Sequence, residues 1–425
     1  MSWQFYKSNH PRYATYVVAM MTTLGVFNTL DRTIVSILVE PIKADLKLSD
    51  TDLGIIMGIG FSLMYAICAF PLARLADRGN RRKILASILA IWSLATALCG
   101  AAQSAWQLVV CRMVMAGGES GQMPIGQSLV ADYVPPAARA RAIGWIGAGT
   151  ALGSVLGLSM GGVLAQAVGW RWTFAVVGLP GVFLALVVFA TIREPREGGT
   201  GAVSARQIPP FLATISLLLR QRSFILLTLS ITLCTLPTSS VTLWNPAVMM
   251  RKFAIPVGQA GFYLGLIAGT AGMLGMVLGG YLGQRGGGGW RGLTWPMLGM
   301  VVAGPLFMLA YHAPTFAASA ALLIIPSVIG GIWYPPLYAA IQNVVTNETR
   351  AIAVATAAFF SSVIGLGLGP TTVGFLSDAF AATHGKDSLR MAVMVVANMT
   401  FLAAGALYLA RRELARCEKL AAATR

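Results

Sequence analysis

Four charged residues lie inside long hydrophobic segments of the sequence. Asp31 and Arg32 follow one another in the first segment, and Arg112 and Glu119 lie seven residues apart in the fourth. A charge at the centre of a bilayer costs at least about 2.5 to 3.5 kcal/mol on insertion scales, so such residues usually face a partner, an ion path or a substrate. They are the first candidates for chemistry. A static ion network that only joins two helices is the competing interpretation.

The spacing of these residues suggests how a proton could be handled. Seven residues are about two helical turns, roughly 10 Å, so Arg112 and Glu119 share a face without pairing directly. Burial disfavours the charged form of a carboxylate, and an approaching guanidinium favours it. Glu119 could therefore load and release a proton as Arg32 leaves and approaches, with Asp31 as the alternative carrier. Arg32, Arg112 and Glu119 are also predicted to bind substrate.

The second half of the chain offers only neutral polar candidates within its hydrophobic segments. Asn245, Trp333 and Tyr334 are predicted to line the substrate site opposite the charged residues. Ordinary helix packing accounts for them equally well. A charged wall facing an apolar wall would suit an amphiphile, whose tail buries apolar area at about 25 cal/mol per Å².

The elements that carry these residues are predicted from hydropathy. The 425 residues are 56% hydrophobic and only 11% charged, with a mean hydropathy of +0.71, whereas soluble domains are roughly 25% charged. A bilayer core takes about 20 apolar residues per helix, so we predict an all-α membrane protein with twelve transmembrane helices. The predicted spans are residues 14–38, 52–72, 84–102, 105–131, 140–166, 172–192, 224–250, 259–282, 293–311, 316–345, 351–377 and 391–410.

A weak internal repeat divides these helices into two pseudo-symmetric six-helix halves. Gly117-Gly118 aligns with Gly330-Gly331 at an offset near 213 residues. We predict an N-terminal half at residues 1–192, a cytoplasmic linker at 193–221, and a C-terminal half with a cytoplasmic tail at 222–425. Repeat-built transporters place the binding site near the midplane between their repeats.

Lys and Arg residues gather in the loops of one side, which sets the predicted orientation. Cytoplasmic loops carry the excess of basic residues, so both termini are predicted to be cytoplasmic, in a bacterial-type inner membrane. The net charge of +16 is then a topology signal, and no nucleic acid partner is expected. The expected partners are the lipid bilayer and a small-molecule or lipid-like substrate, with the protein acting as a monomer.

The loop between the second and third predicted helices carries a charged motif. It includes Asp77, Arg78, Arg81 and Arg82. An Asp at a helix end beside an Arg cluster can latch two helix ends and release them when the bundle moves. A loop that is basic only for topology is the alternative. The stretch from Ala73 to Lys83 resembles the loop motif of the major facilitator superfamily.

More specific motifs resemble the spinster-like branch of that superfamily, over about residues 28 to 195. They are Leu30-Asp31-Arg32, the loop motif above, Arg112 with Gly118-Glu119-Ser120, and Leu129-Val130-Ala131-Asp132. The resemblance implies a proton-linked secondary transporter of lipid-like amphiphiles, such as lysophospholipids or sphingoid phosphates, that works by alternating access. It also implies that the Asp31, Arg32 and Glu119 positions are central to coupling and binding.

Other classes of protein lack support in the sequence. No metalloprotease motif lies in any span, and the run Gly286 to Gly289 lacks the Lys-Ser/Thr of a phosphate loop. No enzyme, metal site, nucleotide partner or cofactor is therefore expected, and a proton is the expected coupling ion. Two alternatives stay open: a transporter of organic or aromatic acids, and a membrane sensor or channel that does not transport.

Overall fold

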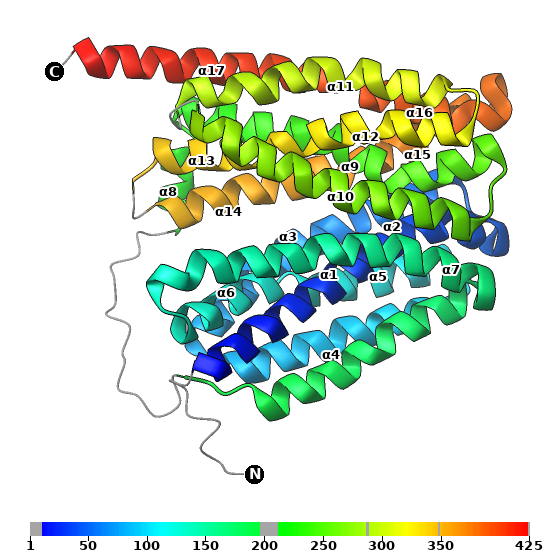
Figure 1. Cartoon of the computed structure of the whole chain (residues 1–425), viewed down its shortest axis with the longest axis horizontal. Coiled ribbons are helices and arrows are strands. Elements are labelled where there is room, and N and C mark those ends of the chain that lie inside the picture. Colours follow the sequence, from blue (N-terminus) through cyan, green and yellow to red (C-terminus); the bar gives the residue numbers. More distant parts are fainter. Residues whose placement is uncertain (1–10, 196–210, 286–288, 347–348, 424–425) are drawn as a thin grey trace. The chain divides into compact units, whose positions relative to one another are not determined.

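The structure, a computed structural model, consists of long helices (Figure 1). It describes residues 11–195, 211–285, 289–346 and 349–423, and no strand occurs in those ranges. The all-α class predicted from the sequence is confirmed.

The helices have the following bounds. The α-helices are α1 (Pro11–Leu46), α2 (Asp50–Met57), α3 (Ile59–Arg78), α4 (Arg81–Cys99), α5 (Ala105–Glu119), α6 (Gln122–Tyr133), α7 (Pro136–Thr191), α8 (Phe211–Leu218), α9 (Arg222–Phe253), α10 (Val257–Arg285), α11 (Thr294–His312), α12 (Phe316–Ile332), α13 (Tyr334–Val344), α14 (Arg350–Phe360), α15 (Gly369–His384), α16 (Ser388–Ala397) and α17 (Thr400–Ala423). Two short 3-10 helices are η2 (Trp290–Leu293) and η4 (Gly385–Asp387), and η3 (Ser361–Leu368) is π-helical.

These helices correspond to the twelve predicted spans. By length and hydropathy, eight runs of the described residues could each cross a membrane. Two of them, Arg141–Thr191 and Ile352–Leu420, hold two crossings each, because α7 reverses at Gly169 and the second run turns at η4. Gly169 has φ +80°, a conformation that glycine adopts without a steric penalty. The other two crossings are α1, whose charged residues lower its hydropathy, and the α5 and α6 pair.

Two helix breaks occur at corresponding places in the repeat. α5 ends at Glu119 and α12 ends at Ile332, positions that the Gly-Gly alignment makes equivalent. In lipid, the backbone groups freed by such breaks are tolerated where protein or a cavity satisfies them. The breaks therefore mark the polar part of each half.

The chain divides into two compact units. The first comprises Met1–Leu48, Gly60–Val203 and Pro256–Gly265, and the second comprises Ser49–Ile59, Ser204–Ile255 and Leu266–Arg425. Helix α2 thus groups with the second unit, whereas α3 belongs to the first. The predicted boundaries at residues 192 and 222 stay predictions. The linker predicted between them includes α8, and its residues 196–210 lie outside the described part of the chain.

In the first unit, α1 packs closely along the first half of α7. A Cβ at Gly153 would collide with the Val26 carbonyl oxygen, and one at Gly157 with Thr33 Oγ1. Small residues let two helix backbones approach closely in a membrane. This contact fixes the height and rotation of α1, and hence of its charged residues.

In the second unit, α9 packs against η3, α15, α16 and α17. Its core contains Phe224, Ile231, Met300 and Leu407, all fully buried. At the other end of α9, the unit is held by polar contacts with α2, described below.

Candidate functional site

An ion pair between Arg32 and Glu119 lies at the centre of the candidate site in the first unit. Arg32 Nη2 on α1 lies 3.2 Å from Glu119 Oε2 at the end of α5. The Arg32 side chain is 29% exposed, whereas that of Glu119 is 0% exposed. The guanidinium is therefore the accessible member of the pair, and an arriving anion would meet it before reaching the carboxylate.

Two aromatic side chains of α3 hold the Arg32 guanidinium. Its Cζ lies 4.9 Å from the ring centroid of Phe61 and 4.9 Å from that of Tyr65. The Cζ of Arg112 lies 4.7 Å from the centroid of Phe61. Cation–π attraction reaches about 2 kcal/mol when the cation is desolvated. Sequence reasoning missed both rings, although their i,i+4 spacing places them on one helix face.

Arg112 and Asp31 are buried in the same cluster. Arg112 is 2% exposed and Asp31 is 1% exposed. Arg112 Nη1 donates to the backbone carbonyl oxygen of Asp31 at 3.4 Å, not to its carboxylate. The structure thus brings all four embedded charges together, but only Arg32 and Glu119 form an ion pair.

Several buried polar atoms in this cluster lack partners. Both carboxylate oxygens of Asp31 and Oε1 of Glu119 accept no hydrogen bond from any residue that the structure describes. An unsatisfied buried polar group costs about 1 to 3 kcal/mol, and more if it is charged. Atoms left in this condition mark a place where a proton, a water or a ligand group can bind.

The helix break after Glu119 brings a further polar side chain into the site. Asn28 Nδ2 on α1 donates to the Glu119 carbonyl oxygen at 3.4 Å. That carbonyl lies at the end of α5, where intrahelical partners are missing. Asn28 was not predicted, because an amide in an apolar span has no distinctive spacing to identify it.

With this geometry established, comparison with known proteins assigns the family. The family model of the Major Facilitator Superfamily matches residues 21–370. The chain belongs to the major facilitator superfamily. It is therefore a multi-pass membrane protein of a transporter family, and the predicted fold of two six-helix halves is confirmed.

Relatives at the level of whole chains refine this assignment. The "MFS-type efflux pump" of Mycolicibacterium smegmatis (strain ATCC 700084 / mc(2)155) is 34% identical over 411 residues, 94% of this chain and 93% of that protein. "Protein spinster homolog 1" of Homo sapiens is 27% identical over 298 residues, 65% of this chain and 55% of that protein. The crystal structure of a bacterial homologue of the human lysosomal transporter Spinster, inward-facing and unoccupied, matches with a TM-score of 0.86 at 25% identity. The match covers 96% of this chain and 98% of that one.

These comparisons bear on two predictions. The resemblance to the spinster-like branch is confirmed. The prediction that the protein is not an enzyme is also confirmed, because the family and these relatives are transporters. Like other members of the superfamily, this protein moves a small-molecule substrate across a membrane.

The neutral candidates of the second unit have different surroundings. Trp333, between α12 and α13, is 7% exposed and forms part of the unit's core. Tyr334 is 44% exposed, and its ring lies 4.5 Å from that of Tyr338. Asn245 Oδ1 accepts a hydrogen bond from the Tyr311 hydroxyl at 3.5 Å. That they line the substrate site opposite the charged cluster stays a prediction.

The predicted latch residues include a buried ion network. The side chains of Asp77 and Arg78 lie outside the described residues. The Arg81 side chain is 0% exposed and is paired with Asp132 at 2.6 Å and with Glu194, whose Oε1 accepts from Nε at 3.1 Å. Arg82 lies instead with its Cζ 5.3 Å from the Phe189 ring centroid. The Arg81 network lies within the first unit, and a latch role for these residues stays a prediction.

A second buried ion pair lies in the second unit and was missed from the sequence. Arg251 donates to both carboxylate oxygens of Asp50, at 2.7 and 2.6 Å, and Ser377 Oγ donates to Asp50 Oδ2 at 2.6 Å. The Asp378 carboxylate accepts the backbone N–H groups of Asp50 and Thr51 at 3.1 and 2.8 Å. These contacts fasten the start of α2 to α9 and α15, which explains why α2 groups with the second unit.

Proposed function

We propose that this transporter couples a proton to an amphiphilic organic anion and carries both in the same direction by alternating access. The observation that supports this most is the Arg32–Glu119 ion pair, in which the accessible cation covers a buried carboxylate. Lysolipids and sphingoid phosphates are the proposed substrate class.

The sign of the coupling follows from that pair. When Glu119 takes up a proton, it no longer competes for the Arg32 guanidinium, so an anionic headgroup binds Arg32 more tightly. By linkage, a bound anion favours protonation of Glu119 to the same degree. One decade of coupling is about 1.4 kcal/mol, and about 2.3 kcal/mol is available per charge per 100 mV. The buried and unpartnered carboxylate of Asp31 is the second proposed proton-binding group.

The rest of the proposed site suits an amphiphile. Arg112 offers a second cation behind Arg32, and the Phe61 and Tyr65 rings supply apolar area beside the headgroup. The proposed tail-binding wall contains Trp333 and Tyr334. No bound cofactor is proposed, the coupling ion is a proton, and the protein acts as a monomer in an inner membrane with both termini cytoplasmic.

A second candidate function is proton-driven efflux. It is favoured by the name of the Mycolicibacterium smegmatis relative, an efflux pump 34% identical to this chain. Efflux by antiport requires a proton and the substrate to exclude one another, for which a cationic amphiphile at Glu119 would be suited. The two functions therefore predict opposite effects of pH on substrate binding.

Ligand binding at two pH values separates these candidates. Purified protein is titrated at pH 6 and pH 8 with lysophosphatidylglycerol, an aromatic acid, a sugar acid and a quaternary ammonium amphiphile, and thermal stabilisation reports binding. We expect lysophosphatidylglycerol to bind best, more tightly at pH 6, and to lose most of its affinity in Arg32→Gln. Preferred binding of the quaternary ammonium, tighter at pH 8, would replace anion symport with cation efflux. Preference for the sugar acid would refute the amphiphile assignment.

A further inference from the structure

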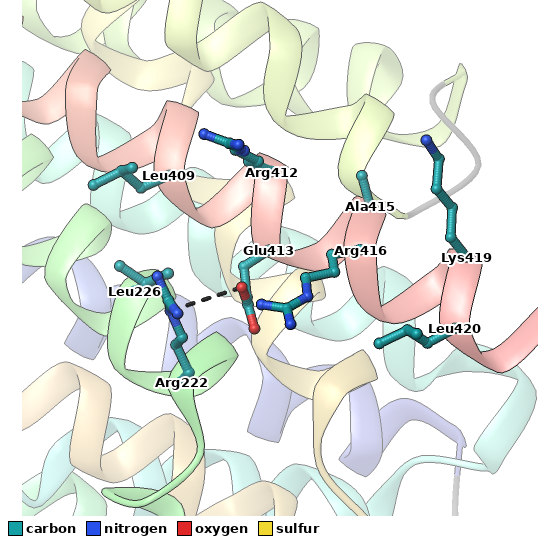
Figure 2. A pocket seen from close by; sticks show the side chains of 9 residues that line it. All are labelled: Arg222, Leu226, Leu409, Arg412, Glu413, Ala415, Arg416, Lys419 and Leu420. Atoms are coloured by element: carbon teal, nitrogen blue, oxygen red, sulfur yellow. Dashed lines mark ion pairs between the residues drawn. The ribbon is translucent and has the colours of Figure 1, made fainter.

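A basic cavity lies where α17 passes the start of α9 in the second unit (Figure 2). Its volume is about 700 Å³, which is within the range of small-molecule sites. Four cationic side chains line it, Arg222 from α9 and Arg412, Arg416 and Lys419 from α17, together with the single carboxylate of Glu413. The cavity therefore has an excess of positive charge, and the transport site described above uses none of these residues.

These cations are not committed to partners within the protein. Arg222 Nε lies 3.7 Å from Glu413 Oε2, too far for a hydrogen bond, and the Arg222 side chain is 71% exposed. Within the described ranges, Arg412, Arg416 and Lys419 are exposed and form no ion pair. An acceptor with several oxygens would find donors from two helices.

The surroundings of the cavity indicate its depth in the membrane. Exposed apolar side chains of α17 end at Leu409, and Arg411 begins the basic part. The Trp290 ring centroid lies 4.9 Å from Arg411 Cζ and 5.2 Å from Arg291 Cζ. Trp is enriched at membrane interfaces, and basic residues concentrate on the cytoplasmic side. Arg412, Arg416 and Lys419 then extend from this level over about two helical turns.

Apolar side chains complete the lining. Leu226 of α9 and Leu409 of α17 contribute to it, as does Leu420. Leu409 is 47% exposed and continues the lipid-facing surface of α17. A ligand with both an anionic head and a hydrocarbon chain would be in contact with cations and leucines at once, which a free inorganic anion would not.

We propose that this cavity binds the phosphate-bearing headgroup of an anionic phospholipid from the cytoplasmic leaflet. The phosphate lies between Arg222 and the Arg412 and Arg416 pair, and an acyl chain runs along Leu409. Basic clusters that directly follow a transmembrane helix recognise anionic lipids in this way. The lipid links the start of α9 to the end of α17, where the protein itself provides only the long Arg222–Glu413 contact.

Native mass spectrometry of the full-length, delipidated protein tests this proposal. It is titrated with phosphatidylglycerol or with zwitterionic phosphatidylcholine, and the retained lipids are counted. We expect phosphatidylglycerol to bind at least tenfold more tightly than phosphatidylcholine. The double variant Arg412→Gln/Arg416→Gln should weaken phosphatidylglycerol binding at least tenfold, equivalent to about 1.4 kcal/mol. The control Lys83→Gln/Arg141→Gln removes the same charge at two exposed positions of the first unit and should bind as the wild type does.

Three results would overturn the proposal. They are equal binding of the two lipids, unchanged binding by the double variant, or displacement of phosphatidylglycerol by an equal concentration of inorganic phosphate. A measurement on the wild type removes any dependence on how the variant folds. At 1 M NaCl the screening length falls to about 3 Å, so the preference for phosphatidylglycerol should shrink, and a preference unaffected by salt would also count against the site.

Discussion

Replacing Arg81 by Gln should destabilise the first unit more than any other loss of one surface or loop charge. Arg81 is fully buried between Glu194 and Asp132, and its own backbone N–H donates to Glu194 Oε2 at 2.7 Å. Removing one partner of a buried ion pair costs about 3 to 5 kcal/mol. Asp132 is 34% exposed, so solvent screens its share and the lower figure applies.

A loss of about 3 kcal/mol, at about 2 to 4 °C per kcal/mol for a domain of 150 to 250 residues, lowers the unfolding midpoint by roughly 6 to 12 °C. Thermal unfolding of the detergent-purified protein measures this shift. Arg82→Gln is the matched control, since it removes the same charge one residue along and loses only a ring contact worth about 0.5 to 1 kcal/mol. If Arg81→Gln melted within about 2 °C of Arg82→Gln, a threshold set by that ring-contact term, the reasoning about burial would be refuted.

Two further variants test the packing of each unit. Asp50→Asn leaves Arg251 without its carboxylate partner and should lower the stability of the second unit by about 3 kcal/mol, measured by thermal unfolding; an unchanged midpoint would contradict the role given to this pair. Gly157→Ala places a methyl group against Thr33 Oγ1 and should cost about 1 to 3 kcal/mol. Gly147→Ala meets open space and should be neutral or slightly stabilising, so equal effects of the two alanines would rule out the close contact between α1 and α7.

The twelve spans could be predicted because backbone groups in lipid must be bonded internally, which leaves long apolar helices as the solution. The same physics identifies Asp31, Arg32, Arg112 and Glu119, since an embedded charge is costly and therefore conspicuous. Even so, the charges in α1 are what keep it out of a search by hydropathy alone.

Pairings between distant segments could not be predicted in the same way. Phe61 over the Arg32 guanidinium is an ordinary apolar residue in the sequence, and its role depends on how α3 lies against α1. Asp50 precedes an apolar run and looks like a loop residue, yet α9 and α15 bury it. Glu194 is 113 positions from Arg81, and nothing local indicates that the two meet.

The central claim, that Glu119 couples a proton to anion transport through Arg32, is tested most directly in proteoliposomes containing Glu119→Gln. Gln mimics the protonated carboxyl group and leaves Arg32 free. We therefore predict that counterflow of lysophosphatidylglycerol at equal pH persists, and that its binding no longer depends on pH between 6 and 8. Accumulation driven by a pH gradient should be abolished. If Glu119→Gln still accumulated substrate against its gradient with the pH dependence of the wild type, Glu119 would be structural, and the coupling group would have to be Asp31.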